Sequence, residues 1–124
     1  MTPVPILAVD DEELIREFIV AALEGGGYEV IQAASAREAF ERLERGVGLL
    51  GGMVTDVNLG PDEPSGWEIA RRAREIDAAL PIVYITGDSA GAWSAQGVPH
   101  SVLLQKPFTS ADLVVALAEL RKSS

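Results

Sequence analysis

The sequence passes directly from a short apolar run into acidic residues at Ile6-Leu7-Ala8-Val9-Asp10-Asp11-Glu12. Four consecutive apolar residues have the length of a strand, and a run without alternation is typical of a strand covered on both faces. Beyond the acids, apolar residues recur at three- and four-residue spacing from Leu14 to Leu23, which predicts an amphipathic helix. A buried strand followed at once by such a helix is the first half of a βαβ unit, from which parallel sheets are built.

The same alternation of strand and helix recurs along the whole chain. Strand-length apolar runs lie at Ile6–Val9, Val30–Ala33, Leu50–Thr55, Ile82–Thr86 and Val102–Leu104. Helical spacing covers 14–23, 39–43, 67–73 and 113–120, with Ser35 at the start of the second helix, Ser110 as the cap of the last, and a weaker helix over Ser89–Gln96. We therefore expect an α/β fold of five βα units, with one parallel sheet between two layers of helices.

The amino-acid composition excludes several classes of function. The chain has 124 residues, no cysteine, and 19 acidic against 10 basic residues, a formal net charge of −9. Its length suits one domain over 1–124 without an output domain. The lack of cysteine excludes disulfide scaffolds and cysteine catalysis. The acidic balance disfavours binding to nucleic acid or anionic membranes, and no apolar run reaches the roughly 20 residues of a membrane span, so we expect a cytoplasmic protein.

Polar residues stand where four of the expected strands end. Asp10 and Asp11 follow the first strand, Asp56 the third, Thr86 closes the fourth, and Lys106 lies just beyond the fifth. In an open parallel sheet, ligand sites form outside the carboxyl ends of the strands, beside the point where the strand order reverses. Each residue alone has an ordinary explanation as a cap, a turn or a solvated charge. Together they predict one crevice with three carboxylates, a hydroxyl and an ammonium group.

The chemistry of this set points to a divalent cation and an anion. Clustered carboxylates raise one another's pKa unless a cation lies among them, and Mg²⁺ prefers hard oxygen ligands. We expect Asp11 and Asp56 to bind Mg²⁺ directly, Asp10 to act through water, and the backbone carbonyl of Asn58 to add a ligand. A carboxylate on a metal beside a lysine and a hydroxyl is suited to accept a phosphoryl group, because these groups neutralise the charge of the transition state.

Four motifs resemble the receiver domain of two-component response regulators, and the likeness covers nearly the whole chain. They are Val9-Asp10-Asp11-Glu12, Thr55-Asp56-Val57-Asn58-Leu59, Ile85-Thr86-Gly87 and Gln105-Lys106-Pro107-Phe108. The resemblance implies a CheY-like, flavodoxin-like (βα)5 fold with strand order 2-1-3-4-5.

The resemblance also implies a role for each motif residue. Asp56 would be the phosphoacceptor, and Asp10 and Asp11 would form the acidic pair that holds Mg²⁺. Thr86 would be the switch hydroxyl that turns toward the phosphoryl group, and Lys106 would pair with that group. The Lys106–Pro107 peptide bond would be cis.

Two features depart from the family pattern. Leu103 stands where the family usually has Tyr or Phe, at the position that moves with Thr86, which places the coupling of these switch residues in question. The loop Asn58–Gly66 is longer than the common form and contains two prolines and two acids. A solvated loop that tolerates insertion is the preferred interpretation, and altered access of a kinase or of water is the alternative.

The implied function is signalling rather than metabolite turnover. The chain would accept a phosphoryl group from a sensor histidine kinase or a histidine phosphotransfer protein, and would catalyse only its own phosphorylation and dephosphorylation. It would then bind an unknown downstream protein, as a monomer or weak dimer. Leu14 and Phe18, on the first helix next to Asp11, are candidates for docking the kinase, with plain core packing as the alternative for Phe18.

Three other functions fit parts of the pattern. A receiver segment of a hybrid histidine kinase would carry the same motifs. A Mg²⁺-dependent phosphatase with an aspartyl nucleophile, similar to haloacid dehalogenases, would place Asp-x-Asp after the first strand and carry a cap domain, whereas here the two acids are adjacent. A flavin- or nucleotide-binding domain would carry a glycine-rich loop at that position, which is acidic here.

Overall fold

Five parallel strands alternate with helices in the computed structural model, which describes residues 4–45, 50–88 and 90–123. The strands are β1 (Pro5–Val9), β2 (Glu29–Ala33), β3 (Gly52–Asp56), β4 (Ile82–Thr86) and β5 (Ser101–Gln105). The helices are α1 (Glu13–Gly25), α2 (Ala36–Glu44), α3 (Gly66–Ile76), α4 (Trp93–Gln96) and α5 (Ser110–Ser123), with a 3₁₀ turn η1 (Ala90–Ala92). The sheet order is β2-β1-β3-β4-β5, which confirms the expected fold.

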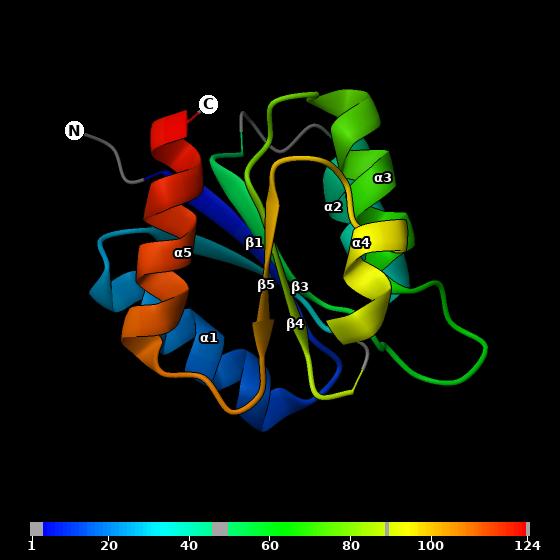
Figure 1. Cartoon of the computed structure of the whole chain (residues 1–124), viewed down its shortest axis with the longest axis horizontal. Coiled ribbons are helices and arrows are strands. Elements are labelled where there is room, and N and C mark those ends of the chain that lie inside the picture. The colour runs from blue at the N-terminus through cyan, green and yellow to red at the C-terminus, as the bar shows by residue number, and fades with distance from the viewer. Residues whose placement is uncertain (1–3, 46–49, 89, 124) are drawn as a thin grey trace.

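Helices cover both faces of the sheet, as Figure 1 shows: α1 and α5 lie on one side, and α2, α3 and α4 lie on the other. Successive residues of β1 enter opposite cores: Ile6 belongs to the core that contains Ile19 and Leu113, whereas Leu7 belongs to the core that contains Ile69 and Tyr84. Because both faces of β1 are buried, its sequence is apolar without alternation. None of the helices in the described ranges is long and apolar enough to span a bilayer.

The predicted start of the second helix is confirmed, whereas that of the last helix is not. Ser35 caps α2, where its hydroxyl accepts a hydrogen bond from the Glu38 amide at 3.1 Å. The prediction that Ser110 caps the last helix is wrong by one residue. Thr109 is the cap, because its hydroxyl accepts from the Asp112 amide at 3.0 Å while the Asp112 carboxylate accepts from the Thr109 amide at 2.9 Å.

Other boundaries also differ from the expected ones: β1, β2 and β5 each begin one residue earlier, and β5 ends one residue later. β3 begins at Gly52 rather than Leu50, because its pairing with β1 starts there, and it runs on to include Asp56. In place of the expected fourth helix over Ser89–Gln96, the structure has the 3₁₀ turn η1 and the single turn of α4. The predicted start at Ser89 lies outside the described residues. Trp93 of α4 remains 38% exposed.

Arg74 on α3 fastens the connection between α4 and β5. Its guanidinium donates hydrogen bonds to the carbonyl oxygens of Leu80 at 2.8 Å, Pro99 at 2.6 Å and His100 at 3.0 Å. His100 has a φ of 57°, so this connection makes a tight turn, which the hydrogen bonds to Pro99 and His100 hold in place. The neighbouring Arg72 instead forms an exposed ion pair with Glu44 on α2.

We predict that Arg74→Ala lowers the free energy of unfolding by about 1–3 kcal/mol, since it leaves the part-buried carbonyl oxygen of Leu80 and the exposed carbonyl oxygens of Pro99 and His100 without their donor. Arg72→Ala is the matched control: it removes the same side chain type from the same helix but breaks only exposed ion pairs, with Glu44 and Glu75, so its effect should be much smaller. Urea denaturation measures both losses, and equal losses would contradict the assigned role of Arg74.

Candidate functional site

The carboxyl ends of four strands deliver the predicted polar residues to one edge of the sheet. Asp10 follows β1, Asp56 is the last residue of β3, Thr86 is the last of β4, and Lys106 follows β5. The strand register keeps these ends level, with Asp56 paired to Ile85 and Thr86 paired to Gln105. Residues that are far apart in the sequence therefore meet at one edge of the sheet, and we call the place where they meet the crevice.

Asp56 is buried, with 4% of its surface exposed, and both of its carboxylate oxygens are hydrogen-bonded. Oδ2 accepts from the Lys106 ammonium at 3.1 Å, and Oδ1 accepts from the Asn58 amide at 3.1 Å. The start of α3 packs against the Asp56 main chain: the Gly66 amide donates to the Val57 carbonyl at 2.8 Å, and a Cβ on Gly66 would overlap the Asp56 carbonyl oxygen. The loop from Asn58 to Gly66 therefore closes tightly onto the end of β3.

Asp56 forms a cluster with three other acids. Asp10, Asp11, Glu12 and Asp56 each offer a carboxylate oxygen, and these oxygens all lie within 4.8 Å of one another. Asp10 is fully buried, and its Oδ1 accepts from the Glu12 amide at 2.9 Å. Its Oδ2 is buried without a hydrogen-bond partner among the described residues. A buried carboxylate oxygen in this position, with more oxygens beside it, fits a small hard cation such as Mg²⁺.

The environment of Asp10 disfavours its charged form. Burial raises the pKa of Asp10 from 3.8 to about 7, the hydrogen bond from the Glu12 amide opposes this rise, and the charge of Asp56 adds to it. Asp11, by contrast, is exposed at the rim of the crevice. The crevice thus combines a buried acid whose proton affinity is high with acids open to solvent.

Lys106 supplies the positive charge. Burial lowers the pKa of Lys106, but the hydrogen bond and charge of Asp56, together with the charges of Asp10 and Glu12, outweigh burial and raise it above its ordinary value. Its Nζ also lies 3.6 Å from Glu12 Oε1. Glu12 is a site residue to which the sequence assigned no role, although it directly follows Asp10 and Asp11.

Thr86 and Leu103 lie on the adjacent strands β4 and β5. The Thr86 hydroxyl is buried and accepts from the Asp88 amide at 3.3 Å, while its carbonyl accepts from the Lys106 amide at 2.8 Å. Leu103 is half-buried and pairs in register with Tyr84, whose ring packs on Trp67 with centroids 4.5 Å apart. Beyond β5, the Lys106–Pro107 peptide bond is cis.

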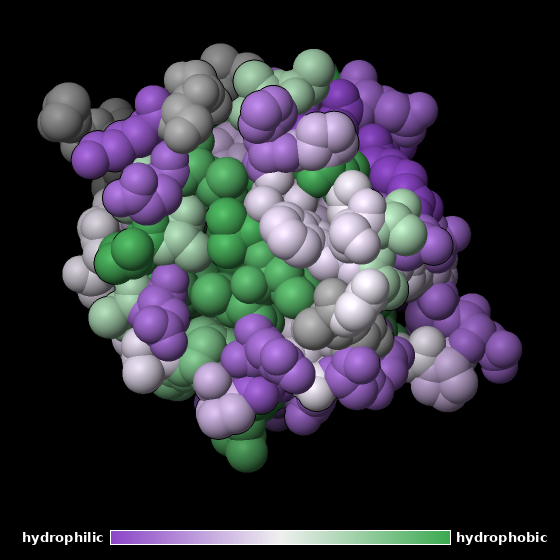
Figure 2. All heavy atoms as spheres, viewed as in Figure 1, coloured by the Kyte–Doolittle hydropathy of each residue, from purple (hydrophilic) through white to green (hydrophobic). Residues whose placement is uncertain are grey.

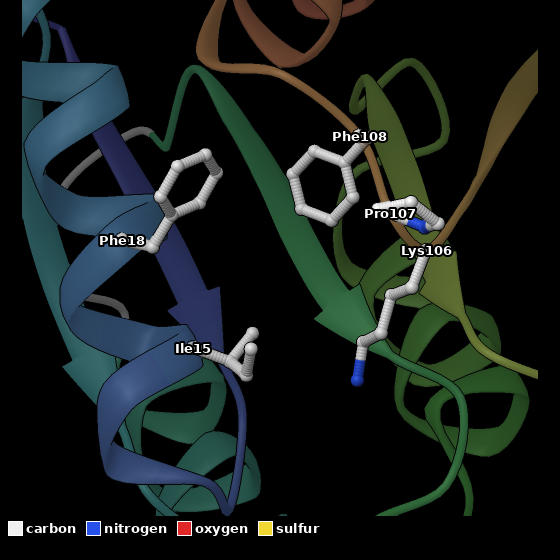
Figure 3. A pocket seen from close by; sticks show the side chains of 5 residues that line it. All are labelled: Ile15, Phe18, Lys106, Pro107 and Phe108. Carbon is white, nitrogen blue, oxygen red and sulfur yellow. The ribbon is translucent and has the colours of Figure 1, made fainter.

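An apolar groove of about 460 Å³ opens beside the crevice. Figure 3 shows Ile15 and Phe18 on α1 facing Lys106, Pro107 and Phe108 across it. The rings of Phe18 and Phe108 meet edge to face with centroids 5.6 Å apart. Phe18 nevertheless remains 39% exposed and Leu14, one turn earlier, 79% exposed, so neither is a core residue.

The family, sequence and structure comparisons all match response regulator receiver proteins. The response regulator receiver domain family matches residues 6–118. The chain is 40% identical to the response regulator receiver protein CpdR of Brucella abortus, over 88% of this chain and 89% of that protein. A solved response regulator receiver protein from Sinorhizobium medicae superposes with a TM-score of 0.93 at 41% identity, over 98% of this chain and 96% of that chain. CheY4 of Vibrio cholerae superposes with a TM-score of 0.78 at 29% identity, over 96% and 99%.

Several relatives are much longer than this chain. The alignment with the sensor kinase CckA of Brucella abortus is 30% identical and covers 93% of this chain but only 12% of that protein. The alignment with the transcriptional regulatory protein TrcR of Mycobacterium tuberculosis covers 47% of that protein. The similarity to these longer proteins therefore extends to one part of each.

The raised pKa of Asp10 predicts a pH-dependent stability in metal-free buffer. Between about pH 4 and pH 7, the native state binds more protons than the unfolded state, so the free energy of unfolding falls as the pH rises through this window. Asp10→Asn should remove the fall, on the order of 2 kcal/mol after solvent screening. Denaturation at several pH values in EDTA measures it, with the exposed Asp62→Asn as the control. An unchanged slope in Asp10→Asn would refute the role of Asp10.

Proposed function

Because this chain belongs to the response regulator receiver domain family, we propose that it accepts a phosphoryl group on Asp56, with Mg²⁺, from a sensor histidine kinase or histidine phosphotransfer protein. The observation that carries the proposal is the buried Asp56 carboxylate, 3.1 Å from the Lys106 ammonium and inside a cluster of four acids. The chain then signals by binding a downstream protein. It acts as a monomer or weak dimer and binds neither nucleic acid nor membrane.

Each residue of the crevice would have a separate role in phosphoryl transfer. A carboxylate oxygen of Asp56 forms a new bond to phosphorus while the P–N bond of the donor phosphohistidine breaks, and the bonding electron pair remains on the donor imidazole. Lys106, whose raised pKa keeps it charged, lies where it neutralises negative charge on the phosphoryl oxygens. Thr86, at the end of the adjacent strand, offers a hydroxyl to the same oxygens.

Asp10, Asp11 and Asp56 would hold Mg²⁺, with Asp10 acting through water and the Asn58 carbonyl as a further ligand. The 4.8 Å cluster and the unpartnered Oδ2 of Asp10 support this assignment. When bound, Mg²⁺ supplies positive charge that offsets both the carboxylates and the incoming phosphoryl oxygens. Mg²⁺ also favours the ionised form of Asp10, against the burial that raises its pKa.

Thr86 and Leu103 would form the switch that reports phosphorylation. The register of β4 with β5 supports this, since Leu103 pairs with Tyr84, two residues before Thr86 and on the same face of the sheet. Leu103 has no ring or polar tip, so the signal at this position would be a repacking of leucine against the core that contains Tyr84.

Leu14 and Phe18 would dock the helices of the kinase or phosphotransfer protein. They are among the large apolar side chains that are exposed, and Phe18 lines the groove that reaches Lys106. A partner bound there would place its histidine next to the crevice. Apolar surface beside a reactive site is typical of a protein-binding surface.

A receiver segment of a hybrid histidine kinase is the second candidate. The receiver domain of the hybrid histidine kinase CckA superposes on this chain with a TM-score of 0.76 at 26% identity, over 94% of this chain. The phosphoryl chemistry would be the same, and only the covalent context of the domain would differ.

We predict that acetyl phosphate and Mg²⁺ add one acid-stable, base-labile phosphoryl group to the protein. Asp56→Asn should abolish this adduct, and Lys106→Ala should still accept phosphate but respond more weakly. Asp62→Asn, which alters an exposed acid of the neighbouring loop, is the matched control and should label normally. Intact mass spectrometry and phosphate release measure the outcome. Labelling that persists in Asp56→Asn would refute the site, and multiple turnover without an adduct would favour the phosphatase alternative.

The docking role of α1 predicts a selective kinetic defect. Leu14→Ala and Phe18→Ala should slow phosphorylation by a histidine kinase about tenfold while leaving phosphorylation by acetyl phosphate unchanged. Val115→Ala, at a 58% exposed position on α5, is the control. If both donors slow equally, or neither does at equal stability, the docking assignment fails.

A further inference from the structure

The two edges of the sheet have different surfaces. Figure 2 shows hydrophobic side chains gathered over β5, between α4 and α5. At the opposite edge, β2 exposes the polar side chains of Glu29 and Gln32, and Gln32 accepts hydrogen bonds from two arginines. Its side-chain oxygen accepts from Arg16 on α1 at 3.1 Å, and its carbonyl accepts from Arg42 on α2 at 3.3 Å. The β2 edge therefore links two helices through one glutamine.

Arg16 extends this link to the acid cluster. Its Nη1 donates to the carbonyl oxygen of Asp10 at 2.9 Å. Its amide donates to the carbonyl of Glu12 at 2.9 Å, in the first turn of α1. Arg16 therefore holds both ends of the segment 10–12, which carries three of the four clustered acids.

The carbonyl of Asp10 needs a donor from outside the sheet because β2 ends too early to supply one. The strand register pairs Val9 with Ala33, the last residue of β2, and the Asp10 amide still donates to the Ala33 carbonyl at 3.2 Å. In a parallel ladder continued by one step, the Asp10 carbonyl would accept from the amide of Ser35. Ser35 is instead the cap of α2, and Arg16 is the donor to that carbonyl.

Three hydrogen bonds thus fix Asp10 from three directions. Its amide donates to Ala33, its carbonyl accepts from Arg16, and its Oδ1 accepts from the Glu12 amide at 2.9 Å. Its Oδ2 is buried and has no hydrogen-bond partner among the described residues, so this is the oxygen left for a ligand. Because the Asp10 carbonyl and the Asp11 amide belong to one planar peptide group, the hydrogen bond from Arg16 also sets the direction in which Asp11 leaves β1.

We propose that Arg16 is a positioning residue for the metal: by holding the Asp10 carbonyl, it keeps Asp10 and Asp11 in the geometry that binds Mg²⁺. This inference rests on the proposed Mg²⁺ site. Arg16 does not bind the ion itself, since a guanidinium has donors but no acceptor. Gln32 supports Arg16 in turn, because its side-chain oxygen fixes the orientation of the planar guanidinium.

The charge and the hydrogen bond of Arg16 act on Mg²⁺ in opposite directions. The positive charge alone would repel the cation, so its removal would tighten binding. That effect is limited, because Arg16 is only half-buried and solvent and salt screen its charge. Loss of a group that orients a metal ligand typically weakens metal affinity by about 10–100-fold. Positioning therefore predicts weaker binding without Arg16, the reverse of what charge alone predicts.

Titration of MgCl₂ into ¹⁵N-labelled protein tests the assignment, with the amide shift of Asp11 as the measure of binding by folded molecules. Arg16→Met keeps the apolar stem and should weaken Mg²⁺ about tenfold. Arg16→Lys should recover part of this loss and bind about threefold more weakly than wild type, because an ammonium can still reach one acceptor. Arg42→Met is the matched control: it removes the donor to the Gln32 carbonyl and should leave the affinity unchanged.

A second measurement needs no metal. In EDTA, hydrogen exchange of the Glu12 amide, which donates to Asp10 Oδ1, should quicken about fivefold in Arg16→Met and stay unchanged in Arg42→Met.

The role of Arg16 is overturned if Arg16→Met binds Mg²⁺ as well as or better than wild type, if Arg42→Met weakens binding equally, or if the exchange of the Glu12 amide does not change. The proposed function fails differently: wild-type protein would then show no Mg²⁺ shift at Asp11, and the role of Arg16 would fall with the metal site. A normal wild-type titration beside an unchanged Arg16→Met titration removes the role of Arg16 alone.

Discussion

Mutual repulsion of carboxylates at the end of the sheet is the constraint on which the rest of the structure depends. Asp10 and Asp56 are buried, Asp11 and Glu12 stand at the rim, and all four offer oxygens within 4.8 Å. Within the described ranges, the Lys106 ammonium reaches Asp56 at 3.1 Å and Glu12 at 3.6 Å. Arg16 also donates to the Asp10 carbonyl oxygen at 2.9 Å, but two positive charges do not balance four carboxylates, so the crevice favours the arrival of further positive charge. Burial raises the pKa of Asp10 to about 7, and the charges of Asp56 and Asp11 add to this rise.

The parallel sheet brings these carboxylates together at one edge, where they form the site. The strand order β2-β1-β3-β4-β5 places β3 between β1 and β4. Asp56, at the end of β3, therefore lies between Asp10, which follows β1, and Thr86, at the end of β4. Gly66 lets the start of α3 approach the Asp56 carbonyl more closely than any side chain would permit. The site is therefore built from main-chain register and close backbone packing, and the loop that follows Asp56 contributes the Asn58 amide to it.

The sequence predicted the fold and the members of the crevice because both follow from local rules. Apolar runs without alternation indicate strands buried on both faces, and polar residues at their carboxyl ends converge in any parallel sheet. Glu12 was missed because its contact with Lys106 depends on how the chain turns after β1, which no local pattern fixes. The cap at Thr109 was missed because Thr109 and Ser110 are both good caps, and only the reciprocal bond to Asp112 decides between them. The exposure of Trp93 follows from the shortness of α4, which depends on tertiary packing.

The proposal that Asp56 accepts the phosphoryl group is tested most directly by a crystal structure of the protein with Mg²⁺ and beryllofluoride, a mimic of that group. It predicts a beryllium bonded to an Asp56 carboxylate oxygen, a metal ion among the oxygens of Asp10, Asp11 and Asp56, and the Lys106 ammonium and Thr86 hydroxyl on the fluorides. A metal ion bound away from this acid cluster, or a beryllofluoride adduct on another residue, would contradict it.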